Sequence, residues 1–220
     1  MSSPEYLFDA MKTPEPEQPV FVLTTPAPAD VSAVLADQSR FGPAVRCFLS
    51  PFDALLGMVF LQRQDSDAVE AVLQSGRLPV GIFFSNRFRQ RPLTVHVAWL
   101  AHENRLIAHQ DGHLIRAARD QAAQWRMSPR RHPVMAIEAE TWAILDRLYE
   151  SAGLFAWRDT LQIARRWLAS PTVEESSLRR AVAALDAVAP MVVPAGEAKQ
   201  LALYDPEAGC WHFVPRDVIA

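Results

Sequence analysis

The hydrophobic positions between residues 50 and 64 recur at the spacing of an α-helix. Apolar residues at positions 52, 55, 56, 59 and 60 fall on one stripe of such a helix. Ser50 stands at the N-cap position, Pro51 follows as the first helical residue, and Asp53 lies in the first turn, where acidic side chains are favoured. The sequence therefore predicts a core-facing helix that begins at residue 51.

Other apolar segments are short and bounded by proline, glycine or polar residues, which is typical of β-strands. The predicted strands are residues 19–25, 44–50, 78–84 and 132–139, and residues 92–110 predict two strands joined by a tight turn. Helices are predicted at residues 29–39, 65–76 and 114–127. The order of these elements lacks the regular alternation of a βαβ fold.

The character of the chain changes near residue 140. Residues 140–153, 154–170 and 172–190 have the apolar spacing of three consecutive helices, and their short connections favour antiparallel packing. The apolar residues predicted to pack between them are Trp142, Leu145, Leu161, Trp167, Leu178 and Leu185. Residues 199–215 then predict a β-hairpin, because "YDPEAGC" combines an Asp-Pro turn start with a glycine suited to positive φ.

These elements predict an α+β fold with a mixed or antiparallel sheet, flanking helices, a three-helix C-terminal segment and a final β-hairpin. Residues 1–19 carry four prolines and several acidic residues and predict an extended N-terminal arm. Residues 20–139 form the sheet-containing region, residues 140–190 the helical segment, and residues 198–216 the hairpin that packs on the rest. A chain of 220 residues organised in this way is expected to form one compact domain.

Composition narrows the class of protein. Half of the residues are apolar and 21% are charged, as in a soluble globular protein, and the net charge of −3 gives no overall attraction to nucleic acid or to an acidic membrane. The N-terminus lacks the basic start and apolar core of a secretory signal, so the default expectation is a cytoplasmic protein. Two of the 22 basic residues are lysines, and this arginine bias is a hint of bacterial origin. Cys47 and Cys210 lie in strand-like apolar settings and are expected to be buried thiols.

The segment "HENRLIAHQDGH" at residues 102–113 is the strongest candidate for chemistry. If the tight turn falls within residues 102–105, Ala98 faces His109 and His96 faces Asp111 across the hairpin. Alternation along the strands then places Val95, Val97, Trp99, Leu106 and Ala108 on a buried face. His96 and His109 would share the opposite, polar face with Asp111, where they could hold a metal ion that activates water. In the competing interpretation Asp111 caps a following helix and the histidines lie on a solvated surface.

Two arginine clusters are the second candidate. One is "NRFRQRP", with Arg87, Phe88, Arg89 and Arg91, and the other is "WRMSPRRHP", with Arg126, Arg130 and Arg131. Alternate arginines in an extended segment share one face, which could bind an acidic protein surface or phosphate groups. A solvated basic edge is the simpler interpretation, and an acidic protein partner is preferred to nucleic acid, because few aromatic residues stand near the arginines.

The aromatic residues of the final hairpin are the third candidate. We interpret Trp211 and Phe213 as core residues of one strand face, with the polar ends of Tyr204 and His212 towards solvent. A ligand pocket at this hairpin is the alternative.

The chain lacks the dinucleotide, P-loop, serine-hydrolase and paired-cysteine zinc motifs, so no cofactor is expected. The preferred function is a non-enzymatic bacterial protein-protein interaction module, such as a toxin-immunity protein or a secretion or regulatory adaptor. The alternatives are a metal-dependent hydrolase that uses His96, His109 and Asp111, and a nucleic-acid-associated regulator that uses the two arginine clusters. The sequence predicts a protein partner and no membrane partner.

Overall fold

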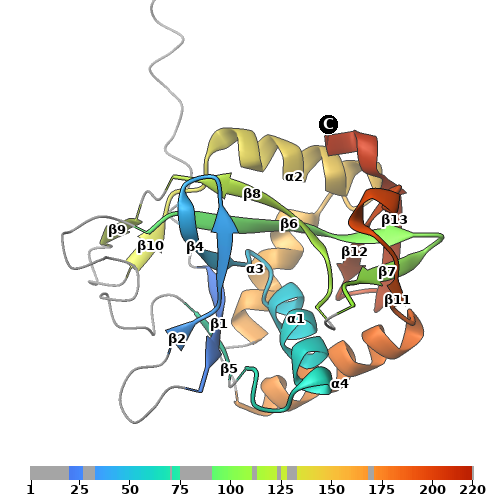
Figure 1. Ribbon diagram of the computed structural model, residues 1–220, viewed down its shortest axis with the longest axis horizontal. Helices are drawn as coiled ribbons and strands as arrows, with labels where there is room; N and C mark the ends of the chain where they lie inside the picture. The colour runs from blue at the N-terminus through green and yellow to red at the C-terminus, as the bar shows by residue number, and fades with distance from the viewer. Residues whose placement is uncertain are drawn as a thin grey trace, which may run out of the picture.

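The computed structural model describes residues 20–26, 33–69, 71–74, 91–110, 113–122, 125–127, 133–167 and 171–219. The described residues form an α+β fold in which helices cover both faces of a mixed sheet (Figure 1). The predicted N-terminal arm and the predicted strand at residues 78–84 lie outside the described residues. None of the described helices is long and apolar enough to cross a lipid bilayer.

The sheet is organised around β6 (Leu93–His102), the longest of the described strands. Its path runs β11 (Met191–Val192), β7 (Arg105–Ala108), β6, β12 (Gln200–Asp205) and β13 (Cys210–Pro215). Residues 93–95 of β6 also pair in parallel with β4 (Gly42–Cys47), which carries β3 (Ala36–Ser39). On the other side, residues 93–99 of β6 pair antiparallel with β8 (Arg116–Gln121). The predicted hairpin at residues 92–110 is confirmed, because β6 and β7 meet at a two-residue turn with positive φ at Glu103 and Asn104.

Three predicted helices are wrong where the structure describes them. Residues 29–39 contribute β2 (Ala33–Val34) and β3, residues 65–76 contribute β5 (Ala71–Gln74), and residues 114–127 contribute β8 and β9 (Trp125–Met127). β1 (Phe21–Thr25) pairs with β2 and β5, and β9 pairs with β10 (Pro133–Met135). Alanine by itself favours helix, so pairing with neighbouring strands overrides the local preference of these short segments.

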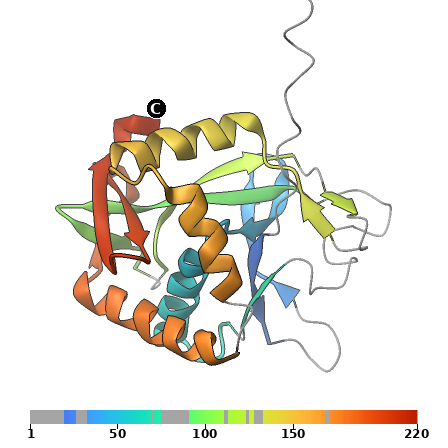
Figure 2. The ribbon, with the colours of Figure 1, turned by 180° about the vertical axis from the view of Figure 1, so that it is seen from behind.

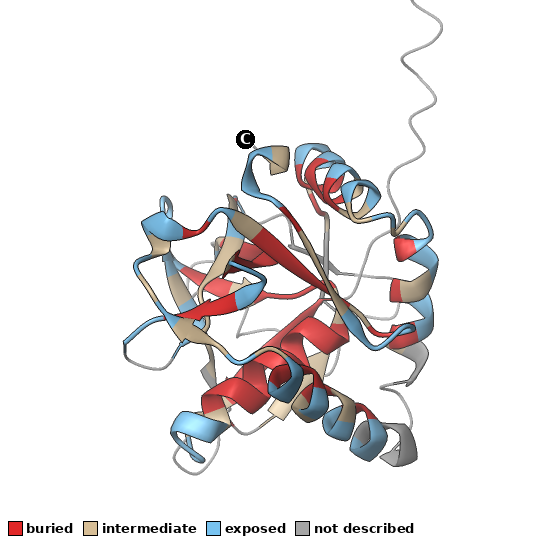
Figure 3. Cartoon of the chain, turned by 90° about the vertical axis from the view of Figure 1, so that its right-hand side faces the viewer, coloured by how far each residue is buried: buried red, intermediate tan, exposed pale blue. Residues whose placement is uncertain are grey.

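The first predicted helix is confirmed as α1 (Pro51–Gln64), and the Oγ of Ser50 accepts a hydrogen bond from the backbone N–H of Asp53 at 3.3 Å. Every residue from position 51 to position 61 is buried, as the largely red helix in Figure 3 shows. More of α1 is buried than the single apolar stripe predicted from the sequence. The main sheet covers one side of α1, and β1, β5 and α4 (Pro171–Ala187) cover other sides.

The three predicted C-terminal helices are present as α2 (Ala139–Ser151), α3 (Trp157–Trp167) and α4. They do not form one bundle: α2 packs on one face of the sheet and against η6 (Arg216–Ile219), whereas α4 packs against α1 on the other face (Figures 1 and 2). Leu178 is exposed, contrary to its predicted packing role. The short 3-10 turn η5 (Ala195–Glu197) leads from α4 and β11 into β12.

A β-bulge in β6 decides which side chains face which core. His96 pairs with Ala118 of β8, but the next paired residue is Ala98, so Val97 is an extra residue in the strand. Val97 and Ala98 therefore both join the core beneath α2, while Trp99 joins the core around α1. The strict alternation predicted for this strand is wrong at this point, and both of its faces are buried.

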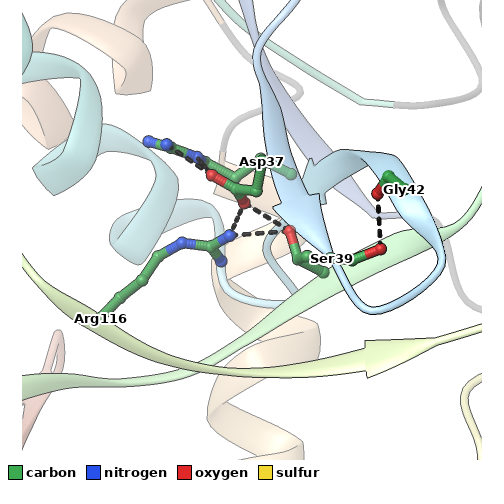
Figure 4. Close-up of polar contacts among 6 residues, drawn as sticks. Asp37, Ser39, Gly42 and Arg116 are labelled. Carbon is green, nitrogen blue, oxygen red and sulfur yellow. Dashed lines mark hydrogen bonds and ion pairs between the residues drawn. The ribbon is translucent and has the colours of Figure 1, made fainter.

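A half-buried ion network ties β3, β4, β6 and β8 together. Asp37 accepts hydrogen bonds from Arg46 at 3.0 and 2.7 Å, from Arg116 and from the hydroxyl of Thr94. Figure 4 shows Arg116 reaching Asp37 across the sheet, with the separate Ser39–Gly42 contact closing the β3–β4 turn beside it. Two guanidinium groups thus depend on a single carboxylate.

Candidate functional site

A cavity of about 190 Å³ opens between the α2–α3 loop, the first turns of α3 and the β12–β13 turn. Ser50, at the start of α1, also lines it. Its aromatic lining residues are Tyr149, Phe155, Trp157 and Tyr204. Aromatic and apolar walls with a few polar groups are typical of ligand and partner sites.

The α2–α3 loop places Phe155 at this cavity. Gly153 adopts φ 78° directly after α2, its N–H bonds to the carbonyl of Glu150 at 2.9 Å, and the N–H of Leu154 bonds to the carbonyl of Tyr149 at 2.8 Å. These two bonds form a Schellman motif, which requires the left-handed backbone that glycine adopts easily. The chain is thereby redirected, and Phe155 is left 79% exposed.

The β12–β13 turn supplies two acidic residues, Asp205 and Glu207, to the lining of the cavity. The Oδ1 of Asp205 accepts hydrogen bonds from the backbone N–H groups of Glu207 and Ala208 at 2.8 and 3.2 Å, and Gly209 adopts φ 70°. The predicted roles of the Asp-Pro pair and of Gly209 are therefore confirmed. Glu207 is fixed in turn by a hydrogen bond from the hydroxyl of Thr160 at 3.0 Å.

A recess of about 10 Å³ adjoins the cavity and shares Ser50, Tyr149, Trp157 and Leu161 with it. It is lined by His96, which is 4% exposed, and by Asp53, which is 7% exposed. Its volume is that of roughly one water molecule or one polar ligand atom.

His96 and Asp53 approach each other without forming a hydrogen bond. The Nε2 of His96 is 3.9 Å from the Oδ1 of Asp53, which accepts instead from the indole N–H of Trp99 at 3.2 Å. Neither ring nitrogen of His96 has a hydrogen-bond partner among the described residues. Buried polar atoms without partners are uncommon in folded proteins, and their bonding is completed by a bound water, an ion or a ligand atom.

Burial shifts both groups towards their neutral forms. It raises the pKa of Asp53 to about 7, although hydrogen bonds with Trp99 and Ser50 act in the opposite direction. Burial, assisted by the positive charge of Arg46, lowers the pKa of His96 to about 3. The recess therefore presents an uncharged imidazole beside a carboxyl group that changes protonation near neutral pH.

The predicted metal site is not assembled in the way the hairpin pattern indicated. His96 lies opposite Ala118 of β8 rather than opposite Asp111, and it is buried, whereas His109 is exposed. The reason is that Ile115 and the strand β8 that follows it pair with β6 where residues 109–111 were predicted to pair. The N–H of Leu100 bonds to the carbonyl of Ile115 at 2.9 Å. Asp111 lies outside the described residues, and no group of three metal-binding side chains occurs within the described ranges.

The arginine clusters fall largely outside the part of the chain that the structure describes. This applies to Arg87, Phe88, Arg89, Arg130 and Arg131. Arg91 is exposed, and Arg126 lies in β9, for which the backbone alone is described. Their predicted role in partner binding stays a prediction.

The final hairpin contributes to the cavity through Tyr204. This residue is buried, contrary to the expectation that its polar end reaches solvent, because it packs between Phe52 and Trp211 with ring centroids 6.2 and 5.3 Å away. The signal for the site was therefore present in the aromatic hairpin. Tyr149, Phe155 and Trp157 were not identified from the sequence, because their convergence depends on where α2 and α3 pack.

The hairpin also brings a cysteine near a histidine. Cys210 is exposed, contrary to the prediction of a buried thiol, and Cys47 is buried as predicted; both are free. The Nε2 of His212 lies 3.5 Å from the Sγ of Cys210 and 3.8 Å from the Oδ2 of Asp205. A nucleophile, base and orienting carboxylate require the two nitrogens of the imidazole separately, so this arrangement is not a catalytic triad.

Comparisons with the models of known protein families, with curated proteins and with solved structures find no match to this chain. The function has to be argued from the site itself.

Proposed function

We propose that the protein is a non-enzymatic interaction module whose cavity receives a side chain of a partner protein. The observation that supports this is the 79% exposure of Phe155, which lines an aromatic cavity. An exposed aromatic side chain beside a preformed pocket is the arrangement of interface hot spots. Burying this ring against a partner would contribute roughly 1.5–3 kcal/mol.

The particular forms of this proposal are a bacterial toxin-immunity protein or a secretion or regulatory adaptor. They rest on the arginine bias of the sequence and on its lack of the dinucleotide, P-loop, serine-hydrolase and paired-cysteine zinc motifs. The cavity adds a location for the contact. Partner binding at the cavity does not depend on the arginine clusters, which would form a separate contact with an acidic partner surface.

The test is a selection of random peptides that bind the full chain, followed by affinity measurements on variants. Phe155→Ala is expected to weaken the selected peptides about tenfold or more, because it removes the ring that covers the bound side chain. Phe41→Ala is the matched control: Phe41 is 47% exposed, in the β3–β4 turn, and does not line the cavity. If no selected peptide distinguishes the two variants, the cavity is not the binding surface.

A further inference from the structure

The cavity carries negative charge without a lining cation. Asp205 and Glu207 lie on one side, and none of the described residues that line it is an arginine, lysine or histidine. The adjoining recess adds a third carboxyl group, Asp53, and an imidazole that burial keeps neutral, His96. This set of groups matches a positively charged ligand.

His96 gives an independent indication that something binds at the recess. Its side chain is almost fully buried, both of its nitrogens lack partners among the described residues, and it lines the recess next to Asp53. A neutral imidazole can accept one hydrogen bond and donate another. A ligand N–H that reached the recess would supply the missing donor.

The pKa of Tyr149 also indicates a negative electrostatic potential at this place. Burial raises the pKa of its phenol well above the usual value, and the carboxylates of Asp53 and Asp205 raise it further. The phenol therefore lies within the influence of a carboxylate of the recess and one of the turn, and both favour a cation over an anion at this place.

The protein already binds one guanidinium group in this way next to the cavity. Arg158 donates to both carboxylate oxygens of Asp146, at 3.0 and 2.7 Å, and its guanidinium carbon lies 4.7 Å from the centroid of Trp142. Arg180 is also close, but it donates to the carbonyl of Pro206 and lies over the ring of Phe52, 5.6 Å from its centroid. Both guanidinium groups border the cavity, because Arg158 also lies 5.6 Å from the ring centroid of the lining residue Trp157 and Pro206 is itself part of the lining. Each is held there by groups of the protein, and the charged side chains that line the cavity itself are carboxylates.

We propose that the cavity binds a basic side chain of the partner, the guanidinium of an arginine or the ammonium of a lysine. Asp205 and Glu207 would attract the charge, the exposed ring of Phe155 would cover it by a cation–π contact, and His96 would accept a hydrogen bond at the recess. This inference rests on the proposed function, since it names the group that the partner inserts. It differs from the acidic partner expected from the arginine clusters, which concerns another surface.

The test uses titration calorimetry of the full chain with three probes: the N-acetyl amides of arginine, lysine and norleucine. Norleucine has the carbon chain of lysine without the charge, so it measures the contribution of the cation. We expect at least one basic probe to bind about tenfold more tightly than the norleucine probe. In Asp205→Asn/Glu207→Gln this preference should disappear, because the new amides keep the acceptors for the turn and for Thr160 but remove both charges.

Asp186→Asn is the matched control, since it removes an exposed carboxylate on α4 that is not part of the lining. It should keep the preference for the basic probes. Equal binding of the basic and norleucine probes, binding of none of the three, or a preference that survives Asp205→Asn/Glu207→Gln would overturn the inference, even if Phe155-dependent peptides are found. If the basic probes bind as expected but no peptide depends on Phe155, the cation site stands as a site for small amines and the proposed protein partner is wrong.

Discussion

Replacing Asp37 with alanine is expected to destabilise the fold by about 3 kcal/mol, the low end for a buried ion pair, because it leaves two half-buried guanidinium groups without their shared carboxylate. Arg116 is the more sensitive of the two. Burial lowers the pKa of Arg116 to about 10, although the negative charge of Asp120 acts in the opposite direction, and the Nη1 of Arg116 lacks a partner among the described residues. Urea unfolding monitored by tryptophan fluorescence measures the loss.

Asp186→Ala is the control for this loss of stability. Asp186 pairs with Arg63 at 2.8 Å, but both side chains reach solvent, so losing this pair should cost no more than about 1 kcal/mol. Adding Arg116→Met to Asp37→Ala should recover part of the stability, because the unpaired charge is removed. Similar losses for Asp37→Ala and Asp186→Ala would mean that solvent screens the network.

The second large effect is a pair of opposite pH dependences at the recess. The pKa of Asp53 is about 7 in the folded protein, against about 3.8 for an unperturbed aspartate. Its protonated form favours the fold, so its contribution is complete below about pH 4 and is lost as the pH rises to about 7. The loss amounts to roughly 1.4 kcal/mol per pH unit within that window.

His96 acts in the opposite sense. Its pKa is about 3 in the fold and about 6.5 when unperturbed, so protons favour the unfolded chain and stability falls as the pH drops from about 6.5 to about 3. In the wild-type protein the two contributions largely cancel between pH 4 and 6.5. The cancellation is a consequence of keeping both groups neutral in the same buried site.

Single variants should separate the two contributions when unfolding free energies are compared with wild type across pH. Asp53→Asn should become more stable relative to wild type as the pH rises from 4 to 7, because it no longer loses a proton. His96→Gln should become less stable relative to wild type over the same rise, with the exposed His109→Gln as the control that shows little change. Reversed slopes would mean that Asp53 and His96 form a charged pair.

Local chemistry allowed several elements to be predicted from the sequence. Ser50, Pro51 and Asp53 define the start of α1, because capping depends on residues within one turn. The β12–β13 turn follows from Asp205 and Gly209 for the same reason. The α+β class followed from the mixture of such segments, although the elements predicted at residues 29–39, 65–76 and 114–127 were wrong.

The candidate site depends on contacts between distant segments, which local sequence patterns do not indicate. His96 was identified as a residue of interest, but its neighbours are Asp53 and Trp99, one of which lies 43 positions earlier in the chain. The bulge at Val97 changes which residues share a face, and no glycine or proline marks it in the sequence. Sequence spacing could therefore predict the strand but not the face on which its histidine lies.

By itself the sequence determined the start of α1, the two hairpin turns and the balance of apolar and charged residues, because these depend on interactions within a few positions. The tertiary structure decided that alanine-rich segments become strands, that α1 is buried on all sides, and that the α2–α3 loop meets the β12–β13 turn to form an acidic, aromatic cavity. These outcomes depend on strand pairing and on desolvation by distant segments, which are properties of the folded chain as a whole.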